Sequence, residues 1–416
     1  MLVVNKLNKE SMINSAIVFM FVLFHIFNLK INFPPYNLIL ISAFFSFFFI
    51  FLKKFNFNPK FYIVLFFIFI QLLVLLVSFL INQNVDFFFF KEIILYEIVS
   101  VFSSYFITNA FFGKSEDRFN RVCFFIFIAV AFQLVLSFLG YINSSIFNVL
   151  FAIFDLGDEN IISHLSEERM VGVGASFFGS GVIDCLILVL IASFIVTEKK
   201  SRKKIYLLMV YFIVAILGML SARTTSVGIV LSLIIIFVNF KNIKLKFFLF
   251  SCLLFFIFLL SNVNSFSDTK LGNLLNFSIG FLMDFKGSNA SNSTSDLVTM
   301  YSKLPDNIKT WLIGDTLYRD GYGYYKGTDI GYFRFIFATG LLGLVIYCLF
   351  IIYLVFNIDS ERVTLFSKFL IILLFFVLMG KGVTIFFPIL LLLYFSSNRY
   401  ATKSGKRKIA YKGLDK

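Results

Sequence analysis

The chain has 416 residues, of which 59% are hydrophobic and 14% are charged, and its mean hydropathy is +0.92. One soluble core could not bury so much apolar surface, so the composition excludes a soluble domain and indicates a polytopic membrane protein. The formal net charge of +14 falls in short basic clusters between apolar runs, which is typical of membrane topology and not of nucleic-acid binding.

The apolar runs predict an all-α fold with about twelve transmembrane helices, because about 20 apolar residues cross a bilayer core as one helix. The last two runs are separated only by Gly380-Lys381-Gly382. We expect a tight turn there, since a single helix would extend about 50 Å. The predicted spans cover residues 12–29, 36–52, 61–81, 87–108, 122–142, 171–196, 205–221, 226–240, 247–263, 329–356, 364–379 and 383–396.

The distribution of basic residues predicts the orientation of these spans. With the N-terminus inside, most of the 37 Lys and Arg residues fall on the inner side, and the connection 197–204 alone carries five of them. Basic residues concentrate in short cytoplasmic loops. Both termini are therefore expected in the cytoplasm, including the basic tail 397–416.

Two long loops lie on the outer side in this topology. The first, 143–170, follows the fifth span, and the second, 264–328, separates spans one to nine (1–263) from spans ten to twelve (329–396). The second loop contains a Ser/Asn-rich patch at 288–295 and, before it, an apolar spacing at 271–285 that is typical of a surface-lying helix. We expect the large loop before the tenth span to be exposed outside the membrane.

Arginines cluster at predicted outer helix ends. Arg169 precedes span six, Arg223 precedes span eight, Arg334 lies about one turn into span ten, and Arg319 lies in the loop upstream. Helix N-termini carry unsatisfied N–H groups and a positive dipole end. A guanidinium beside such an end suits a phosphate or pyrophosphate. Alternatively, each arginine extends to the membrane interface or pairs with a loop carboxylate.

Hydroxyl groups next to Arg223 add further donors for an anion. Thr224 and Thr225 follow it directly, at the start of span eight. Arg223 itself lies between two long apolar runs, on the predicted outer side, where basic residues are less common. This position favours a functional role.

Asp329 is the candidate catalytic carboxylate at the start of span ten. It is either the helix N-cap, a position that favours Asp, or a general base that faces a substrate hydroxyl near the bound phosphate. Asp315 and Asp320 have glycine neighbours and are interpreted as turn residues. His164, in the first outer loop, remains a further candidate.

Asp184 in span six needs a partner, because an unpaired carboxylate is costly inside a membrane. The candidates in span four are Lys91, Glu92 and Glu97. We interpret this group as structural pairing inside the helix bundle.

The sequence gives no sign of a metal site or a cofactor. All four cysteines lie inside apolar runs, without a CxxC pair or a neighbouring histidine, which supports neither a disulfide framework nor a zinc site. No acidic cluster has the spacing of metal ligands.

Three places in the chain carry a resemblance to a known family. They are Arg169 with the Gly-rich start of span six, Ser221-Ala222-Arg223 before span eight, and Leu312-Ile313-Gly314 followed by Thr328-Asp329-Ile330-Gly331-Tyr332 and Gly340-Leu341-Leu342-Gly343. Their order and sidedness resemble the O-antigen polymerases (Wzy), within the wider group of bacterial polysaccharide polymerases and O-antigen ligases. The related ligases place a histidine where Asp329 stands here, which favours a polymerase.

The resemblance implies an inner-membrane glycosyltransferase that acts at the periplasmic face without a nucleotide sugar or a metal. A glycan would be released from one undecaprenyl pyrophosphate and joined to the terminal sugar of another lipid-linked repeat unit, giving O-antigen or a similar surface polysaccharide. Arg169, Arg223 and Arg334 would hold the pyrophosphate, and Asp329 would deprotonate the acceptor hydroxyl. The implied partners are the lipid-linked oligosaccharide, membrane lipid and, as a candidate, a chain-length regulator protein.

Two other functions fit the same composition. A flippase for the same lipid-linked unit would also have about twelve spans, but we expect it to have short loops and related halves. An O-antigen ligase would attach the glycan to lipid A-core instead. The long outer loop and the arginines at one face favour the polymerase over the flippase.

Overall fold

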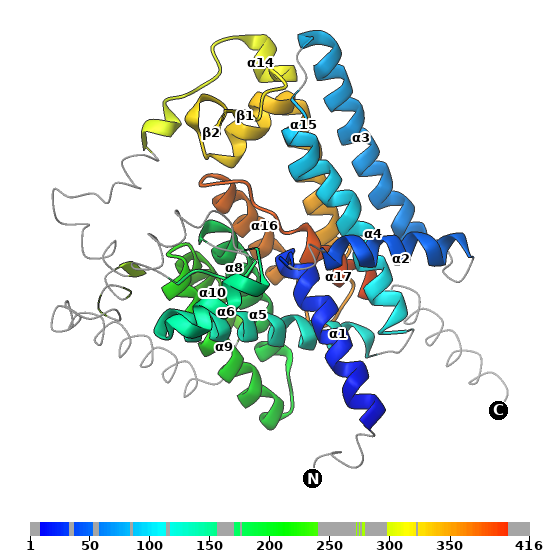
Figure 1. The fold of residues 1–416 in the computed structure, drawn as a ribbon, viewed down its shortest axis with the longest axis vertical. Coiled ribbons are helices and arrows are strands. Elements are labelled where there is room, and N and C mark those ends of the chain that lie inside the picture. Colours follow the sequence, from blue (N-terminus) through cyan, green and yellow to red (C-terminus); the bar gives the residue numbers. More distant parts are fainter. Residues whose placement is uncertain are drawn as a thin grey trace.

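The computed structural model is helical in all its described elements except one β-hairpin of two two-residue strands (Figure 1). It describes residues 9–32, 37–52, 58–83, 86–113, 117–155, 170–174, 177–239, 272, 274, 277–278, 298–321 and 323–397. The predicted ninth span (247–263), the arginine at 169 and the histidine at 164 lie outside these residues. The all-α prediction is confirmed for the part of the chain that the structure describes.

Six helical segments among the described residues are long and apolar enough to cross a membrane. One of them is a π-helical turn, η1 (Phe90–Ile94), that continues directly into α4 (Leu95–Ala110). The others are α3 (Pro59–Asn82), α5 (Arg118–Ile142), α8 (Phe177–Thr197), α9 (Ser201–Ser221) and α15 (Gly331–Phe356). These segments confirm a multi-pass membrane architecture.

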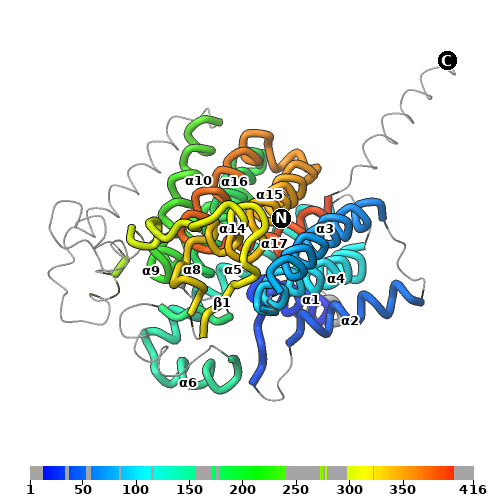
Figure 2. Tube along the Cα trace, turned by 90° about the horizontal axis from the view of Figure 1, so that it is seen from above, coloured from blue at the N-terminus to red at the C-terminus, as the bar shows by residue number. Residues whose placement is uncertain are grey.

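The other apolar helices are shorter. They are α1 (Lys9–Phe27, apolar from Ile13), α2 (Leu38–Phe51), α6 (Ser144–Ile153), α10 (Thr225–Asn239), α16 (Leu365–Met379) and α17 (Phe387–Ser396). At 1.5 Å per residue, α2 extends only about 21 Å, less than the roughly 30 Å core of a bilayer. Figures 1 and 2 show α2 lying across the direction of α3 and α4. The twelve runs therefore do not all form full-length helices.

Helix α6 was not among the predicted elements, because its ten residues fall in the predicted outer loop 143–170. The Asn143 side chain caps it by accepting a hydrogen bond from the Ser145 N–H, a favoured N-cap arrangement. Val149 and Ile153 are exposed while Leu150 is buried. The loop therefore begins with a short helix that carries apolar side chains on its exposed face as well.

The turn predicted at Gly380-Lys381-Gly382 is confirmed, since α16 ends at Met379 and α17 begins at Phe387. The proline at the start of α17 suits this position because its missing N–H would have no helical partner there.

The helices form two groups side by side (Figure 2). Helices α5, α8, α9, α10 and α16 pack together in one group, and α1, α2, α3 and α4 lie in the other, with α15 and α17 between them. In the most apolar 18-residue stretch of each helix, 89% of the residues are buried in α8 and 28% in α3. A helix that is apolar on all sides suits such a central position, so α8 is the centre of its group and α3 faces outward.

A polar network connects the second group inside the bundle. His25 on α1 contacts Ser103 through Nδ1 at 2.8 Å, and its Nε2 lies 2.9 Å from the Ser104 hydroxyl and 3.1 Å from the Pro388 carbonyl of α17. Hydrogen-bonded polar side chains hold membrane helices together because no water is there to compete. His25 therefore joins α1, α4 and α17.

The close crossing of α14 (Ile308–Ile313) and α15 explains two glycines, Gly314 and Gly340. Helix α14 crosses α15 where Gly340 interrupts the helix with φ +68° and ψ −173°. A Cβ at Gly340 would collide with the Leu312 carbonyl, and one at Gly314 would meet the backbone of residues 338–340. The crossing thus requires glycine on both sides.

The interruption in α15 frees carbonyl groups that find partners outside the helix. The Phe337 carbonyl accepts a 2.7 Å hydrogen bond from the Asp315 N–H. The Ser78 hydroxyl of α3 donates to the Ile313 and Ala338 carbonyls at 2.9 and 3.4 Å. A break at membrane depth is tolerated only when such groups are satisfied again, so α3, α14 and α15 form one interlocked unit.

Gly340→Ala should destabilise this unit by at least about 2 kcal/mol, because its backbone conformation is nearly restricted to glycine and the added methyl group collides with α14. Thermal unfolding of the detergent-solubilised protein measures the effect. Gly323→Ala is the control, since a Cβ there meets no atom closer than 3.9 Å. Equal melting temperatures for the two variants would show that the crossing tolerates a side chain.

Candidate functional site

A cavity of about 780 Å³ opens at one end of the helix bundle. Its walls come from the end of α1, from η1, from the start of α8, from the start of α15 and from the turn after α16. Figure 1 shows α14 and the hairpin, β1 (Arg319–Asp320) and β2 (Gly323–Tyr324), at the end of the molecule opposite the start of α1. We call this space the Glu92 cavity.

Four cationic and two acidic side chains line the Glu92 cavity. The cations are Lys30, Lys91, Arg334 and Lys381, and the acids are Glu92 and Asp329. They come from segments far apart in the chain and give the cavity an excess of two positive charges. This excess favours an anionic ligand.

Glu92 is the centre of the charged cluster. Its Oε1 lies 2.5 Å from an Arg319 guanidinium nitrogen, and its Oε2 lies 3.8 Å from Arg334. The Glu92 side chain is 28% exposed and that of Arg334 only 8%. One carboxylate thus positions two of the four predicted arginines.

Two tyrosine rings enclose the Arg334 guanidinium. Its central carbon lies 3.5 Å from the ring centroid of Tyr324 and 4.3 Å from that of Tyr318. Planar guanidinium groups stack favourably on the faces of aromatic rings. Burial raises the pKa of Tyr318, with Arg334 opposing the shift, so this ring stays neutral while it faces the cation.

Asp86 fixes the loop that supplies these groups. Its Oδ2 accepts hydrogen bonds from the N–H groups of Tyr318 and Arg319 at 2.7 and 3.1 Å, and its Oδ1 accepts one from the Phe88 N–H at 2.8 Å. Carboxylate bonds to backbone N–H groups are short and strong. Asp86 therefore fastens the loop between α14 and α15 to the start of the η1–α4 segment.

The π-helical turn η1 brings Lys91 and Glu92 to the cavity. Such turns shift the following side chains around the helix axis and recur at functional sites. Glu92, one of the three candidates for pairing with Asp184, pairs with the arginines instead. Asp184 accepts a 3.3 Å hydrogen bond from Ser180 on its own helix, and Glu97 is buried without a hydrogen bond on either oxygen.

Asp329 lines the cavity with an exposed side chain. Helix α15 begins at Gly331, its N-cap is Ile330, and no side chain caps it. The Ile330 N–H instead donates a 3.3 Å hydrogen bond to the Thr328 hydroxyl oxygen. The interpretation of Asp329 as the helix cap is therefore wrong, which leaves its carboxylate facing the cavity.

The other predicted anion-binding residues are placed differently. Arg223 does not line the Glu92 cavity: its Nε donates to the Phe277 carbonyl at 2.6 Å, and its guanidinium lies 4.5 Å from the Phe277 ring centroid. Thr225 is buried and donates to the Gly218 carbonyl at 3.0 Å. Thr224 is not in the lining either, but its hydroxyl accepts a 3.2 Å hydrogen bond from the ammonium of Lys381, which is.

Two further carboxylates of the loop lie elsewhere. Asp315 accepts a 2.6 Å hydrogen bond from the Thr310 hydroxyl, and Asp320 lies at the end of β1, opposite Gly323. Neither residue lines the Glu92 cavity. The structure thus separates Asp329 from the other two acids of the loop.

Sequence reasoning did not assign the three lysines of the lining, Lys30, Lys91 and Lys381, to anion binding. Lys91 lies at the start of an apolar run and Lys381 in a glycine turn, so each alone resembles an ordinary interfacial residue. Their proximity to Arg334 depends on contacts between segments far apart in the chain. Comparison with protein-family models, curated proteins and solved structures finds no match, so the case for a function depends on the cavity itself.

Proposed function

We propose that the protein joins oligosaccharide repeat units carried on undecaprenyl pyrophosphate, as an O-antigen polymerase of the Wzy type. In this proposal it resides in the bacterial inner membrane as about twelve membrane segments, with both termini in the cytoplasm and residues 264–328 in the periplasm. The Glu92 cavity then faces the periplasm. The alternatives are an O-antigen ligase and a flippase for the same lipid-linked unit.

One observation supports the proposal: the cavity at the end of the bundle is lined both by cations and by a carboxylate that caps no helix. Lys91, Arg334 and Lys381 supply positive charge, and Asp329 lies in the same lining. The cations can bind a lipid pyrophosphate. The carboxylate can accept the proton that a sugar hydroxyl must lose. The cavity contains both kinds of group, as a glycosyl transfer requires.

The proposed reaction uses these groups in one displacement. Asp329 accepts the proton of the acceptor hydroxyl while the oxygen attacks the anomeric carbon of the donor glycan. The bond between that carbon and the pyrophosphate oxygen breaks, and its electron pair leaves with undecaprenyl pyrophosphate. Arg334, Lys91 and Lys381 offset the charge that develops on the leaving group, which lowers the barrier because this charge is greatest in the transition state.

Purified protein in liposomes with lipid-linked repeat units tests the proposal directly. A ladder of longer glycans on the lipid carrier, formed without a nucleotide sugar, is the expected result. Transfer to lipid A-core alone would assign a ligase. Movement of the lipid between leaflets without any new glycosidic bond would assign a flippase and contradict the polymerase.

Lys91→Gln should raise the KM for the lipid-linked donor about five-fold and leave kcat nearly unchanged. The reason is that an exposed cation beside an anionic lipid contributes about 1 kcal/mol to binding in the ground state and the transition state alike. Lys309→Gln is the matched control, since Lys309 is exposed on α14 at the same end but does not line the cavity. Equal KM values in the two variants would show that Lys91 does not bind the lipid-linked donor.

A further inference from the structure

A second cavity, of about 640 Å³, lies at the opposite end of the bundle and takes no part in the proposed reaction. Its lining includes Glu198, which follows the end of α8, and Arg362, which follows the end of α15. The Glu92 cavity is lined by the beginnings of the same two helices. The two cavities therefore face opposite sides of the membrane, and we call the second the Arg362 cavity.

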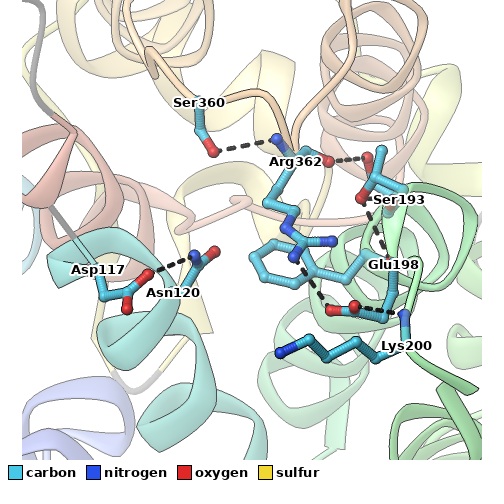
Figure 3. Close-up of polar contacts among 9 residues, drawn as sticks. Asp117, Asn120, Ser193, Glu198, Lys200, Ser360 and Arg362 are labelled. Atoms are coloured by element: carbon cyan, nitrogen blue, oxygen red, sulfur yellow. Dashed lines mark hydrogen bonds and ion pairs between the residues drawn. The ribbon is translucent and has the colours of Figure 1, made fainter. Parts of the chain in front are cut away.

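The polar framework of the Arg362 cavity is built around one ion pair (Figure 3). The Arg362 guanidinium lies 3.0 Å from Glu198 Oε2, and Glu198 Oε1 accepts a 2.9 Å hydrogen bond from the Lys200 N–H. The Ser193 hydroxyl donates to the Arg362 carbonyl at 2.6 Å. Glu198 is 8% exposed and Arg362 24%, so the pair is fixed and its two charges cancel.

Three further cations line the cavity against one further acid. Arg121 belongs to α5, Arg202 and Lys203 to the first turn of α9, and the acid is Asp117. Among the described residues, none of these three cations makes an ion pair. The first turn of α9 has no side-chain cap on its N–H groups, which adds partial positive charge at the same place. This rim favours an anion.

The wall beside these cations is aromatic and open to the surroundings. Phe124 on α5 is 47% exposed and Tyr206 on α9 is 37% exposed, and their ring centroids lie 5.8 Å apart. Both residues lie about one turn deeper in their helices than the nearest cation, Arg121 or Arg202. The cations therefore lie at the helix ends, and the exposed aromatic surface lies about one turn further into the helices.

We infer that the Arg362 cavity binds an anionic phospholipid. Arg121, Arg202 and Lys203 contact its phosphate headgroup, and the acyl chains lie along Phe124 and Tyr206. Basic pockets between membrane helices recognise anionic headgroups in this way. A soluble phosphate would use the cations but would gain nothing from the exposed aromatic wall. The basic cluster of 199–204 assigns this end to the cytoplasmic leaflet.

Lipid binding to the full-length protein tests the inference, with native mass spectrometry measuring the Kd of bound phosphatidylglycerol. Wild-type protein should bind phosphatidylglycerol more tightly than phosphatidylcholine. The double variant R202Q/K203Q should weaken phosphatidylglycerol binding about thirty-fold, because each basic residue beside an anionic lipid contributes about five-fold. Arg121→Gln, on a different helix, should weaken it about five-fold.

The double variant K199Q/K204Q is the matched control, because these lysines belong to the same basic cluster but do not line the cavity. It should bind phosphatidylglycerol with the wild-type Kd. Equal losses in the two double variants would mean general surface attraction and overturn the assignment. So would equal affinity for the two lipids, or displacement of the bound lipid by millimolar inorganic phosphate, which would indicate a soluble anion as the ligand.

Discussion

Asp329→Asn is expected to lower the rate of repeat-unit transfer by about 10²- to 10⁴-fold, the contribution typical of a general base. Asparagine has nearly the same shape but does not accept the acceptor's proton. The protein should still insert and fold, because the Asp329 side chain caps no helix. The measurement is the glycan ladder on the lipid carrier, which should collapse to single repeats, together with the thermal stability of the variant.

Asp320→Asn controls for a general loss of negative charge from the loop between α14 and α15. Asp320 is exposed on the same loop but does not line the Glu92 cavity, so its variant should give a normal ladder. A normal ladder from Asp329→Asn as well would rule out the base. The proton would then have to be accepted by another group in the cavity lining, such as Glu92.

The long apolar runs could be predicted from sequence because membrane helices of about 20 residues leave a clear hydropathy signal. Ranges such as 61–81 and 122–142 correspond closely to α3 and α5. The signal fails for α6, whose ten residues form a helix too short to register as a span, and it overestimates α2, whose apolar run is too short to cross. Hydropathy alone does not distinguish a full span from a shorter packed helix.

The candidate site was predictable only in part. Arg334 and Asp329 could be proposed because each lies at the start of a predicted span, where helix-end chemistry makes a local argument possible. Glu92 was assigned the wrong partner, because its contacts with Arg319 and Arg334 depend on how Asp86 fastens the loop between α14 and α15. Such pairing between distant segments leaves no local pattern in the sequence.

The close approach of Gly314 and Gly340 gives a physical reason for one stretch of the resemblance. The two glycines stand in separate motifs, Leu312-Ile313-Gly314 and Gly340-Leu341-Leu342-Gly343, and the fold places them in contact. A glycine is needed wherever two backbones approach this closely. These motifs therefore position the loop that carries Tyr318 and Arg319, and they do not contribute groups to the cavity.

Arg334→Lys is the second change for which we expect a large effect, a fall in transfer rate of about a hundred-fold or more with the positive charge retained. Lysine keeps the charge but loses the planar fork and the contact with the Tyr318 and Tyr324 rings. A guanidinium held at that position has its orientation set before the substrate arrives, and such preorganised charge contributes about 10²- to 10³-fold where it meets a developing anion. The loss should therefore appear in kcat more than in KM.

Arg319→Lys is the control that distinguishes a catalytic role of Arg334 from a structural role of the ion pairs around Glu92. Both arginines pair with Glu92 and both lie near the Tyr324 ring, but only Arg334 lines the cavity. If Arg334 binds the leaving pyrophosphate, Arg319→Lys should retain most of the activity while Arg334→Lys does not. Equal losses in both variants would mean that the Glu92 cluster only maintains the fold of the loop, and the anion would then have to be held by Lys91 and Lys381 alone.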